Sequence, residues 1–320
     1  MKAPFPWFGG KRRQADAVWR ALGRDVPNYV EPFAGSLAVL LGRPGGAGKI
    51  ETVNDLNCDI ANFWRAIAAN PDAVAEWANW PVNEADMHAR NSWLVSEVQA
   101  HRERMHTDAE YYDEKRAGWW VWGQCIWIGS GWCGEPGVSV QHDRPRPNLR
   151  DQGINSGLPS LGNDRGINGV AAAPCAEWFS ALQCRLRRTR VACGDWRRVL
   201  TPSVLGKGKN VGGRMPVAVF LDPPYSHAHR DARIYNDDDG ALSGQVREWA
   251  LAHGDDPDLR IALCGYEGEH TMPSSWAVHA WKAARGYAGA SNNNRELERI
   301  WFSPYCLPLN AQRGLFEVRP

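Results

Sequence analysis

A short apolar segment that ends in an acid and two prolines constrains this chain more than any other feature. Residues 217–221 (VAVFL) are rich in β-branched and aromatic side chains and predict a buried strand. Asp222-Pro223-Pro224-Tyr225 follow without a spacer. Open α/β sheets bind their ligands at the carboxyl ends of their strands, so the segment predicts an α/β fold with a ligand site at Asp222.

The DPPY tetrapeptide itself is suited to binding a planar amine. Asp222 supplies a carboxylate, and the two prolines remove amide donors, so the carbonyls of Asp222 and Pro223 can face a donating ligand. Tyr225 adds a flat ring for stacking. This combination favours an exocyclic amine on a flat ring, such as a nucleobase. The alternative is a strand that ends in a rigid turn with a surface tyrosine.

Glycine-containing turns occupy two earlier parts of the chain. Residues 7–11 (WFGGK) combine aromatic side chains, a Gly-Gly turn that lets the backbone approach a ligand, and a lysine for a carboxylate or phosphate. Residues 28–36 (NYVEPFAGS) predict a strand and a glycine bend, and an apolar helical segment follows. This arrangement is typical of the first βα turn of a nucleotide-binding sheet, although the dinucleotide pattern GxGxxG is not present.

Acids end two further predicted strands. Residues 50–55 end in Asp55, about 20 residues past the glycine turn, where α/β nucleotide sites hold a ribose diol. The same acid also suits the N-cap region of the helix predicted at 57–69. Residues 190–195 form another predicted strand that ends in Asp195. Beyond DPPY, 259–264 predict a buried strand, and 277–281 and 298–302 predict a terminal antiparallel pair.

Residues 71–173 break the alternation of strands and helices. Tryptophan-rich helical segments are followed by a stretch rich in Gly, Asn, Arg and Pro with almost no periodicity. We therefore predict an inserted target-recognition region at 71–173 within a catalytic domain formed by 1–70 and 174–320. Most of its tryptophans are expected in the core, and a minority on nucleic acid.

Charge is distributed unevenly, although the net charge is only +1. Residues 140–215 contain thirteen Lys and Arg against five Asp and Glu. A basic surface on a neutral protein suits a phosphate backbone. A solvated basic face without a partner is the alternative.

Cysteine and hydropathy patterns predict a cytoplasmic protein without a metal. The eight cysteines form no CxxC pair, which predicts free buried thiols. The pairs His101/His106 and His227/His229 have no cysteine or acid at a supporting spacing. No apolar run approaches the roughly 20 residues that cross a bilayer, and the N-terminus lacks the apolar core of a secretory signal.

In their order along the chain, WFGGK, EPFAG and DPPY resemble one known family. The chain is similar to DPPY-type DNA adenine-N6 methyltransferases, in which the donor motif precedes the recognition region and DPPY comes last. The resemblance covers roughly 60% of the chain. It departs at Ser36-Leu37, where many relatives continue with glycine.

This resemblance implies a Rossmann-like mixed sheet, a methyl donor and a role for each matching residue. The donor is S-adenosyl-L-methionine. The catalytic residues are Asp222, Pro223, Pro224 and Tyr225. The cofactor-binding residues are Trp7, Gly10, Lys11, Glu31, Phe33, Ala34, Gly35, Asp55, Asp195 and Trp196.

The implied activity is site-specific methyl transfer to N6 of an adenine flipped out of double-stranded DNA. It would take place in the cytoplasm of a bacterial or phage-infected cell, for restriction-modification or phage DNA modification, without an obligate protein partner. We expect phosphate contacts from Arg144, Arg146, Arg150, Arg185, Arg187 and Arg188. The alternatives are the same chemistry on RNA adenine, cytosine N4 or a protein glutamine, and a DNA-binding relative that has lost catalysis.

Overall fold

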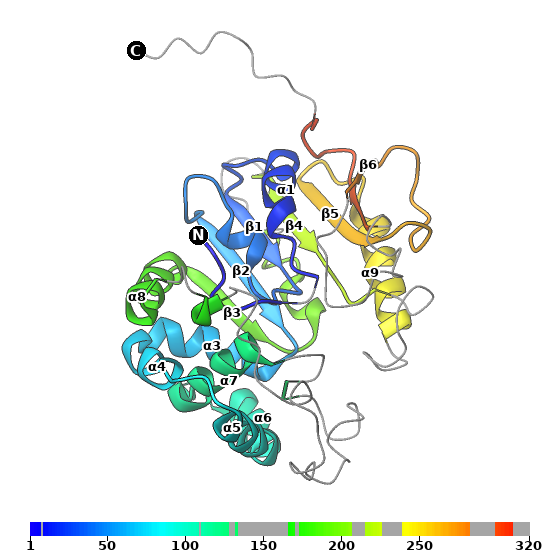
Figure 1. The fold of residues 1–320 in the computed structure, drawn as a ribbon. Helices are drawn as coiled ribbons and strands as arrows, with labels where there is room; N and C mark the ends of the chain where they lie inside the picture. Colours follow the sequence, from blue (N-terminus) through cyan, green and yellow to red (C-terminus); the bar gives the residue numbers. More distant parts are fainter. Residues whose placement is uncertain are drawn as a thin grey trace, which may run out of the picture.

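A seven-stranded mixed sheet forms the centre of the computed structural model (Figure 1). The structure describes residues 1–7, 9–108, 110–127, 132–133, 166–169, 173–206, 215–225, 239–281 and 298–309.

The strands are β1 (Asn28–Glu31), β2 (Ile50–Asp55), β3 (Thr189–Cys193), β4 (Val217–Leu221), β5 (Leu259–Tyr266), β6 (Ala277–Ala280) and β7 (Glu298–Phe302). They lie in the order β3-β2-β1-β4-β5-β7-β6. The first five are parallel, and β7 is antiparallel to both β5 and β6. The predicted α/β fold with a terminal antiparallel pair is confirmed.

Helices cover both faces of this sheet. The α-helices are α1 (Ala15–Leu22), α2 (Ala38–Leu41), α3 (Cys58–Ala69), α4 (Pro71–Ala78), α5 (Glu84–Ser96), α6 (Val98–Thr107), α7 (Glu114–Ile126), α8 (Cys175–Leu186) and α9 (Asp239–His253). Three short 3-10 helices accompany them, η1 (Arg12–Gln14), η2 (Gly166–Asn168) and η3 (Trp196–Val199).

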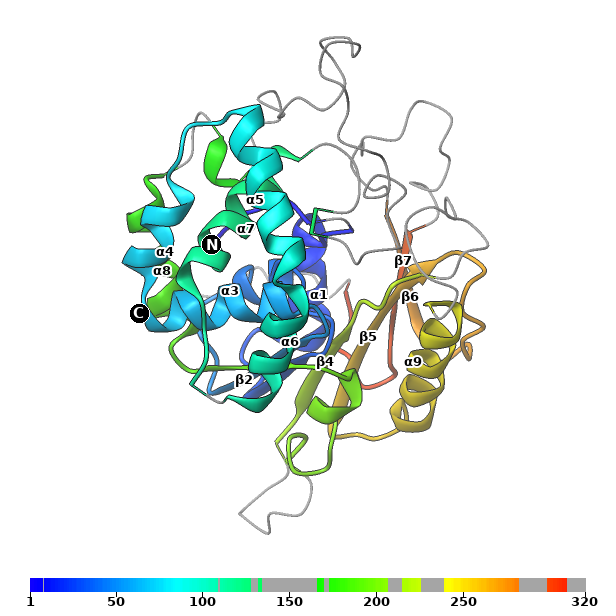
Figure 2. The same ribbon diagram turned by 90° about the horizontal axis from the view of Figure 1, so that it is seen from below.

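The apolar residues of β4 explain why both faces must be covered. Side chains alternate along a strand, so Ala218 and Phe220 join the core beneath α1, α3, α7 and α8, whereas Val219 and Leu221 join the core beneath η3 and α9. Figure 2 shows α9 beside β5, well apart from the helices around α3 and α7. A strand that is apolar at every position therefore sits in the middle of a three-layer fold.

The order of the strands places the topological switch point of the sheet, called the crevice below, between β1 and β4. From β1 the chain moves outward to β2 and β3, then returns to the other side of β1 to form β4 and β5. The connections that follow β1 and β4 therefore run to opposite sides of the sheet. In open α/β sheets, ligands bind at the carboxyl ends of two such neighbouring strands. Glu31 ends β1, and Asp222 follows β4 directly. The crevice thus lies between two acids.

Helices α4, α5 and α7 share one apolar core with α3, α8 and the sheet, whereas α6 packs Met105 against α3 in a separate small cluster. Trp120 and Trp122 are buried, and the Trp120 ring lies 4.9 Å from the ring of Phe5. Trp77 and Trp80 remain exposed. The expectation that the tryptophans of 71–173 serve the core is thus confirmed for Trp120 and Trp122. No helix in the described part of the chain is both long and apolar enough to cross a bilayer.

Candidate active site

Four side chains from distant segments meet beside the end of β4. The Lys11 ammonium lies 3.0 Å from Asp222 Oδ1 and 3.5 Å from Glu298 Oε2. The Tyr225 hydroxyl lies 3.0 Å and 3.1 Å from the same two oxygens and shares its one proton between them. The N-terminal turn, the DPPY segment and the last strand β7 therefore form one hydrogen-bonded cluster.

Lys11 is almost completely buried, so its charge depends on these partners. Burial lowers the pKa of its ammonium, but Asp222 and Glu298 raise that pKa more strongly, and it lies above its ordinary value. Lys11 therefore stays protonated and fixes one oxygen of Asp222. Asp222 keeps 19% of its side chain exposed, so it is the member of the ion pair that faces outward.

Tyr225 is oriented differently from the prediction of an open stacking surface. Its side chain is only 2% exposed, and its ring lies 4.7 Å from that of Tyr266, edge to face. Burial raises the pKa of its hydroxyl well above the ordinary value, and the charge of Asp222 raises it further. In this arrangement Tyr225 is a neutral hydrogen-bond donor to two carboxylates. Of the two prolines, Pro223 is buried and Pro224 is half-buried.

The turn after β1 is closely packed against Trp7. Gly35 has a φ of +46°, and a Cβ at this position would lie 2.6 Å from Cδ1 of the Trp7 indole. Only glycine avoids both the strained backbone and the clash. Ala34 is buried beside it, and its amide donates to the carbonyl of Asn54 at 2.9 Å. The glycine and tryptophan of the two predicted turns are thus in direct contact.

Asp55 connects the turn after β1 to the start of α3. Its Oδ2 accepts from the Gly35 amide at 2.8 Å, and its Oδ1 accepts from the Asn57 amide at 2.9 Å. Asn57, rather than Asp55, is the N-cap of α3. Each carboxylate oxygen has a second lone pair, so Asp55 retains acceptor capacity for a diol.

Glu31 is a buried acid at the crevice. Its side chain is 2% exposed and accepts a hydrogen bond of 2.9 Å from the Tyr29 hydroxyl. Burial and the nearby charge of Asp222 raise the pKa of Glu31 to about 8, although the Tyr29 bond lowers it. Such a carboxyl group is ready to ionise beside a cation.

Asp195 and Trp196 differ from each other in their surroundings. Asp195 is exposed, caps η3 through the Arg197 amide at 2.8 Å, and pairs with the Arg197 guanidinium at 3.2 Å. The Trp196 ring is buried and lies 5.9 Å from that of half-buried Phe33. Phe33 and Trp196 thus supply an aromatic wall between the ends of β1 and β3.

These residues fit the implied methyl donor. Asp55 offers oxygen acceptors for a ribose, Glu31 offers a carboxylate for the ammonium of a methionine, and the Phe33–Trp196 pair offers rings for an adenine. The N-terminal turn packs closely against the turn after β1. A Cβ on Gly10 would lie 3.2 Å from the Trp7 carbonyl and 3.9 Å from Ser36 Oγ, so this position has little room for a side chain.

The Arg185 prediction is wrong. Its guanidinium is buried and bonds both oxygens of Glu51, at 2.7 Å and 3.1 Å, and the carbonyl of Leu40 at 3.0 Å. To bind a phosphate, the Arg185 guanidinium would have to leave the buried cluster that it forms with Glu51 and Arg43. Arg185 stabilises the fold by joining α8 to β2.

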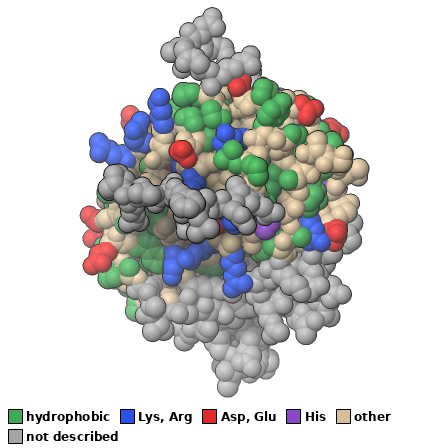
Figure 3. Space-filling model, turned by 90° about the horizontal axis from the view of Figure 1, so that it is seen from above, with side chains coloured by type: hydrophobic (Ala, Val, Ile, Leu, Met, Phe, Trp, Pro, Cys, Tyr) green, Lys and Arg blue, Asp and Glu red, His purple; other side chains and the backbone are tan. Residues whose placement is uncertain are grey.

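Arg187 and Arg188 are exposed, but they lie away from the crevice. They connect α8 to the first residue of β3, whereas Asp222 follows the last residue of β4. Because β3 and β4 run in the same direction in the sheet, these arginines are at the opposite edge from Asp222. Arg144, Arg146 and Arg150 lie outside the described residues. On the face drawn in Figure 3, Lys and Arg side chains form several separate groups with Asp and Glu among them.

Sequence reasoning missed Glu298 and Tyr266, which complete the cluster around Tyr225. Glu298 is an acid at the first position of an otherwise largely apolar strand, which is a usable signal for a buried functional acid. Tyr266 ends β5, the strand next to β4, and so lies at the same edge of the sheet as Tyr225.

Comparison with known proteins agrees with this geometry. Residues 7–137 match the sequence model of the D12 class N6 adenine-specific DNA methyltransferases. The matched range includes the N-terminal turn, Glu31, Gly35 and Asp55, and it ends before the DPPY segment. No curated protein matches the chain.

Proposed function

Because residues 7–137 match the D12 class N6 adenine-specific DNA methyltransferases, we propose that the chain catalyses this reaction and that Asp222 is the group that binds and activates the target amine. The family uses S-adenosylmethionine to methylate adenine in DNA. The observation that carries the proposal is the ion pair between Lys11 and Asp222 at the switch point of the sheet. It holds a carboxylate, partly exposed, where the fold binds its ligands.

Asp222 and Pro223 would act together on the amine. Asp222 accepts one N6 hydrogen, and the carbonyl of Pro223 accepts the other, which shifts electron density towards the nitrogen lone pair. Lys11 keeps Asp222 in place, because its ammonium is buried and cannot turn towards solvent. Pro224 fixes the backbone direction at this turn.

The donor would occupy the turns after β1 and β2. Glu31 binds the ammonium of its methionine part, Asp55 binds the ribose hydroxyls, and Phe33 with Trp196 flanks the adenine. Trp7, Gly10, Ala34 and Gly35 shape the turn around it. Asp195 caps η3 and so positions the neighbouring Trp196. When bound, S-adenosylmethionine would supply an activated methyl group, because its sulfur would keep the electrons of the broken C–S bond. The N6 nitrogen would form the new bond and give its proton to the Asp222 carboxylate.

The target adenine must leave the double helix to reach Asp222. The Asp222 side chain is four-fifths covered by the protein, so only its small outward-facing part can meet a base. Extruding a base from a duplex costs a few kcal/mol, which stacking and backbone contacts offset. For Tyr225 to stack on this base, its ring must turn away from Tyr266.

We assign recognition of the DNA sequence to residues 71–173, between the catalytic segments 1–70 and 174–320. Helices α4 to α7 attach this region firmly to α3 and α8. Arg144, Arg146 and Arg150 are its candidate phosphate contacts. A duplex bound by this region would present its target adenine to Asp222, beside the methyl donor.

One experiment tests the role of Asp222. The protein is incubated with labelled donor and duplex DNA, the DNA is digested, and the modified nucleoside is identified. Asp222→Ala and Asp222→Asn should abolish N6-methyladenine formation, while donor binding by calorimetry stays within a few-fold of the unaltered protein. Asp25→Asn, a change of an exposed acid remote from the crevice, should leave both unchanged.

Two results would contradict the proposal. Equal loss of donor binding and transfer in Asp222→Asn would assign Asp222 to the donor site. Label found in cytosine or RNA, but not in DNA adenine, would mean that the DPPY segment receives a different amine.

A further inference from the structure

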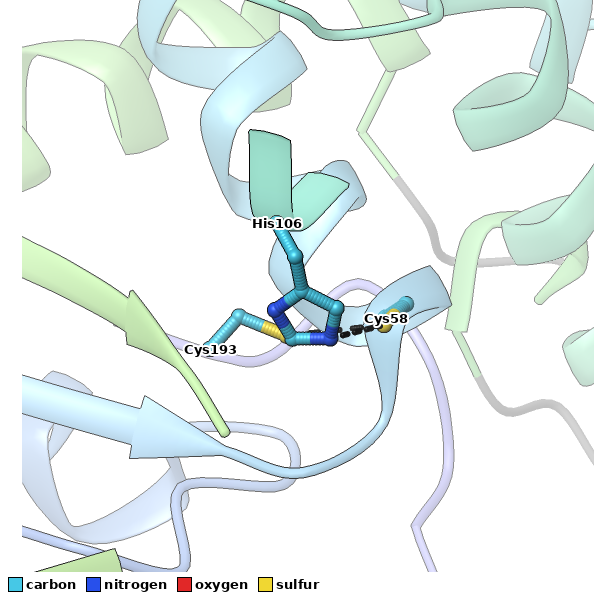
Figure 4. Close-up of side chains that lie close together, drawn as sticks. All are labelled: Cys58, His106 and Cys193. Atoms are coloured by element: carbon cyan, nitrogen blue, oxygen red, sulfur yellow. Dashed lines mark hydrogen bonds between the residues drawn. The ribbon is translucent and has the colours of Figure 1, made fainter. Parts of the chain in front are cut away.

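Two cysteines and a histidine meet beside the ends of β2 and β3 (Figure 4). Cys58 is the first residue of α3, Cys193 is the last residue of β3, and His106 lies in the last turn of α6. Cys58 Sγ is 3.6 Å from Cys193 Sγ and 3.8 Å from His106 Nε2. All three ligand atoms lie within 4.8 Å of one another.

The two distances from Cys58 are close to the edges of a tetrahedral metal site. Zinc binds sulfur at about 2.3 Å and imidazole nitrogen at about 2.0 to 2.1 Å, so tetrahedral geometry separates two sulfurs by about 3.8 Å and a sulfur from a nitrogen by about 3.5 Å. The measured values differ from these by a few tenths of an ångström. A disulfide requires about 2.05 Å between its sulfurs, and both cysteines are free thiols.

The three ligands differ in their exposure to solvent, and Cys58 is the buried member of the group. His106 is exposed and Cys193 is half-buried, so an ion can enter from solvent.

We propose that Cys58, Cys193 and His106 bind one zinc-class divalent cation, with the fourth position open to water. This differs from the prediction of no metal, which considered only spacing along the chain. The three ligands are far apart in the sequence and come together through the pairing of β2 with β3 and the packing of α6 on α3.

A cation at this position would hold both donor turns. Asp55 is three residues before Cys58, and Asp195 is two residues after Cys193. The two turns already touch, because the Gly194 amide donates to the Asp55 carbonyl at 3.0 Å. Metal binding would therefore fasten α6, from the predicted recognition region, to the ends of β2 and β3. The metal would act on these turns only and would take no part in methyl transfer.

The test uses the full-length protein, reduced and freed of metal by a chelator, then titrated with Co²⁺ or Zn²⁺ alone. We expect one Co²⁺ per chain, the near-ultraviolet band of sulfur-to-cobalt charge transfer and the visible bands of tetrahedral cobalt, all removed by Zn²⁺. Cys58→Ser, Cys193→Ser and His106→Gln should each weaken binding by at least about a hundredfold, since even outer-shell changes cost 10- to 100-fold. Cys184→Ser removes an exposed cysteine of α8 and should change nothing.

His106→Gln keeps the test decisive if a cysteine variant misfolds, because His106 is exposed and its loss should leave the melting temperature of the metal-free protein unchanged. The proposal is wrong if the reduced protein takes up no Co²⁺. It is equally wrong if His106→Gln binds Co²⁺ with unchanged affinity and spectrum. A Cys58–Cys193 disulfide in aerated protein, together with no metal uptake after reduction, would identify a redox pair instead. None of these measurements depends on methyl transfer.

Discussion

Lys11 and Asp222 form a 3.0 Å ion pair between the N-terminal turn and the end of β4. Lys11 also donates to the Gly9 carbonyl at 2.8 Å, so the turn that carries it is fixed as well. The pair therefore joins a segment of the predicted donor site to the predicted catalytic acid. Either residue is expected to affect both the stability and the activity of the protein.

Replacing Lys11 by Met should destabilise the fold. The change leaves Asp222 and buried Glu298 facing each other without a cation, and breaking a buried ion pair costs about 3 to 5 kcal/mol. Urea denaturation of the donor-free protein measures this loss. Lys49→Met, at an exposed position, is the matched control and should cost much less. A Lys11→Met protein as stable as the control would show that the acids do not need this cation.

Two changes at Tyr225 should separate its ring from its hydroxyl. Tyr225→Phe keeps the ring and removes bonds to two carboxylates, so we expect a loss of about 1.5 to 3 kcal/mol in stability and a modest fall in the rate of transfer. Tyr225→Ala also removes the stacking ring, and we expect kcat to fall at least about a hundredfold further. Single-turnover methylation of duplex DNA gives both rates. Identical rates for the two variants would exclude stacking as the role of Tyr225.

The buried carboxyl of Glu31 should make stability depend on pH. Its pKa is about 8 in the folded protein against an ordinary 4.5, so between these values the folded state holds a proton that the unfolded state has lost. Its contribution is therefore complete below pH 4.5 and is lost as the pH rises through about 8, by an amount on the order of 4 kcal/mol. Glu31→Gln should remove this part of the pH dependence in denaturation curves.

The same group should couple donor binding to proton release. A cationic methionine ammonium favours the ionised carboxylate, so donor affinity should increase as the pH rises towards 8. Calorimetry in buffers of different ionisation enthalpy counts the released protons. Neutral Glu31→Gln should bind more weakly and release fewer protons, and unchanged proton release would point to another group.

Gly35→Ala should impair the donor site more than the same change at another left-handed glycine. Gly35 and Gly46 both have positive φ, but a Cβ would clash with Trp7 only at Gly35, since nothing lies within 4 Å at Gly46. The strain alone costs about 1 to 2 kcal/mol. We expect donor affinity, measured by calorimetry, to fall at least tenfold in Gly35→Ala and to stay unchanged in Gly46→Ala. Equal affinities would show that Trp7 moves aside without cost.

The arginines of the basic segment should differ in their effect on DNA binding. Replacing Arg144, Arg146 and Arg150 together by Ala should lower the slope of log affinity against log salt by up to about 3, because each phosphate contact contributes about 0.9. Arg187→Ala with Arg188→Ala should leave the slope unchanged, because this pair lies at the opposite edge of the sheet from Asp222. A lower slope in the Arg187/Arg188 variant, with an unchanged slope in the Arg144/Arg146/Arg150 variant, would place the duplex along α8.

Local patterns predicted the parts of the fold that depend on neighbouring residues. The apolar run at 217–221 and the alternation at 298–302 match β4 and β7 to the residue, because burial sets both patterns directly. The glycine turn at Gly35 was predictable for the same local reason, and its positive φ confirms it. Leu37 has a φ of 55° at the place where relatives continue with glycine, so the backbone keeps the glycine-like conformation although the side chain differs.

Contacts between distant segments were not predictable in this way. Glu298 joins Lys11 only because β7 lies antiparallel beside β5, and a strand pattern does not specify its neighbours. Arg185 was predicted to be a surface cation, because the charge pattern of its segment carries no information about its partner Glu51 on β2. The Cys58–His106–Cys193 group escaped notice for the same reason, since spacing along one chain cannot show a site assembled from three elements.

The position of Glu298 also has a consequence during protein synthesis. The Lys11 ammonium needs an acid from β7, and β7 is synthesised after the other six strands of the sheet. A nascent chain can form β1 to β5 and still lack the second acid beside Lys11. The site is therefore expected to remain incomplete until β7 has left the ribosome.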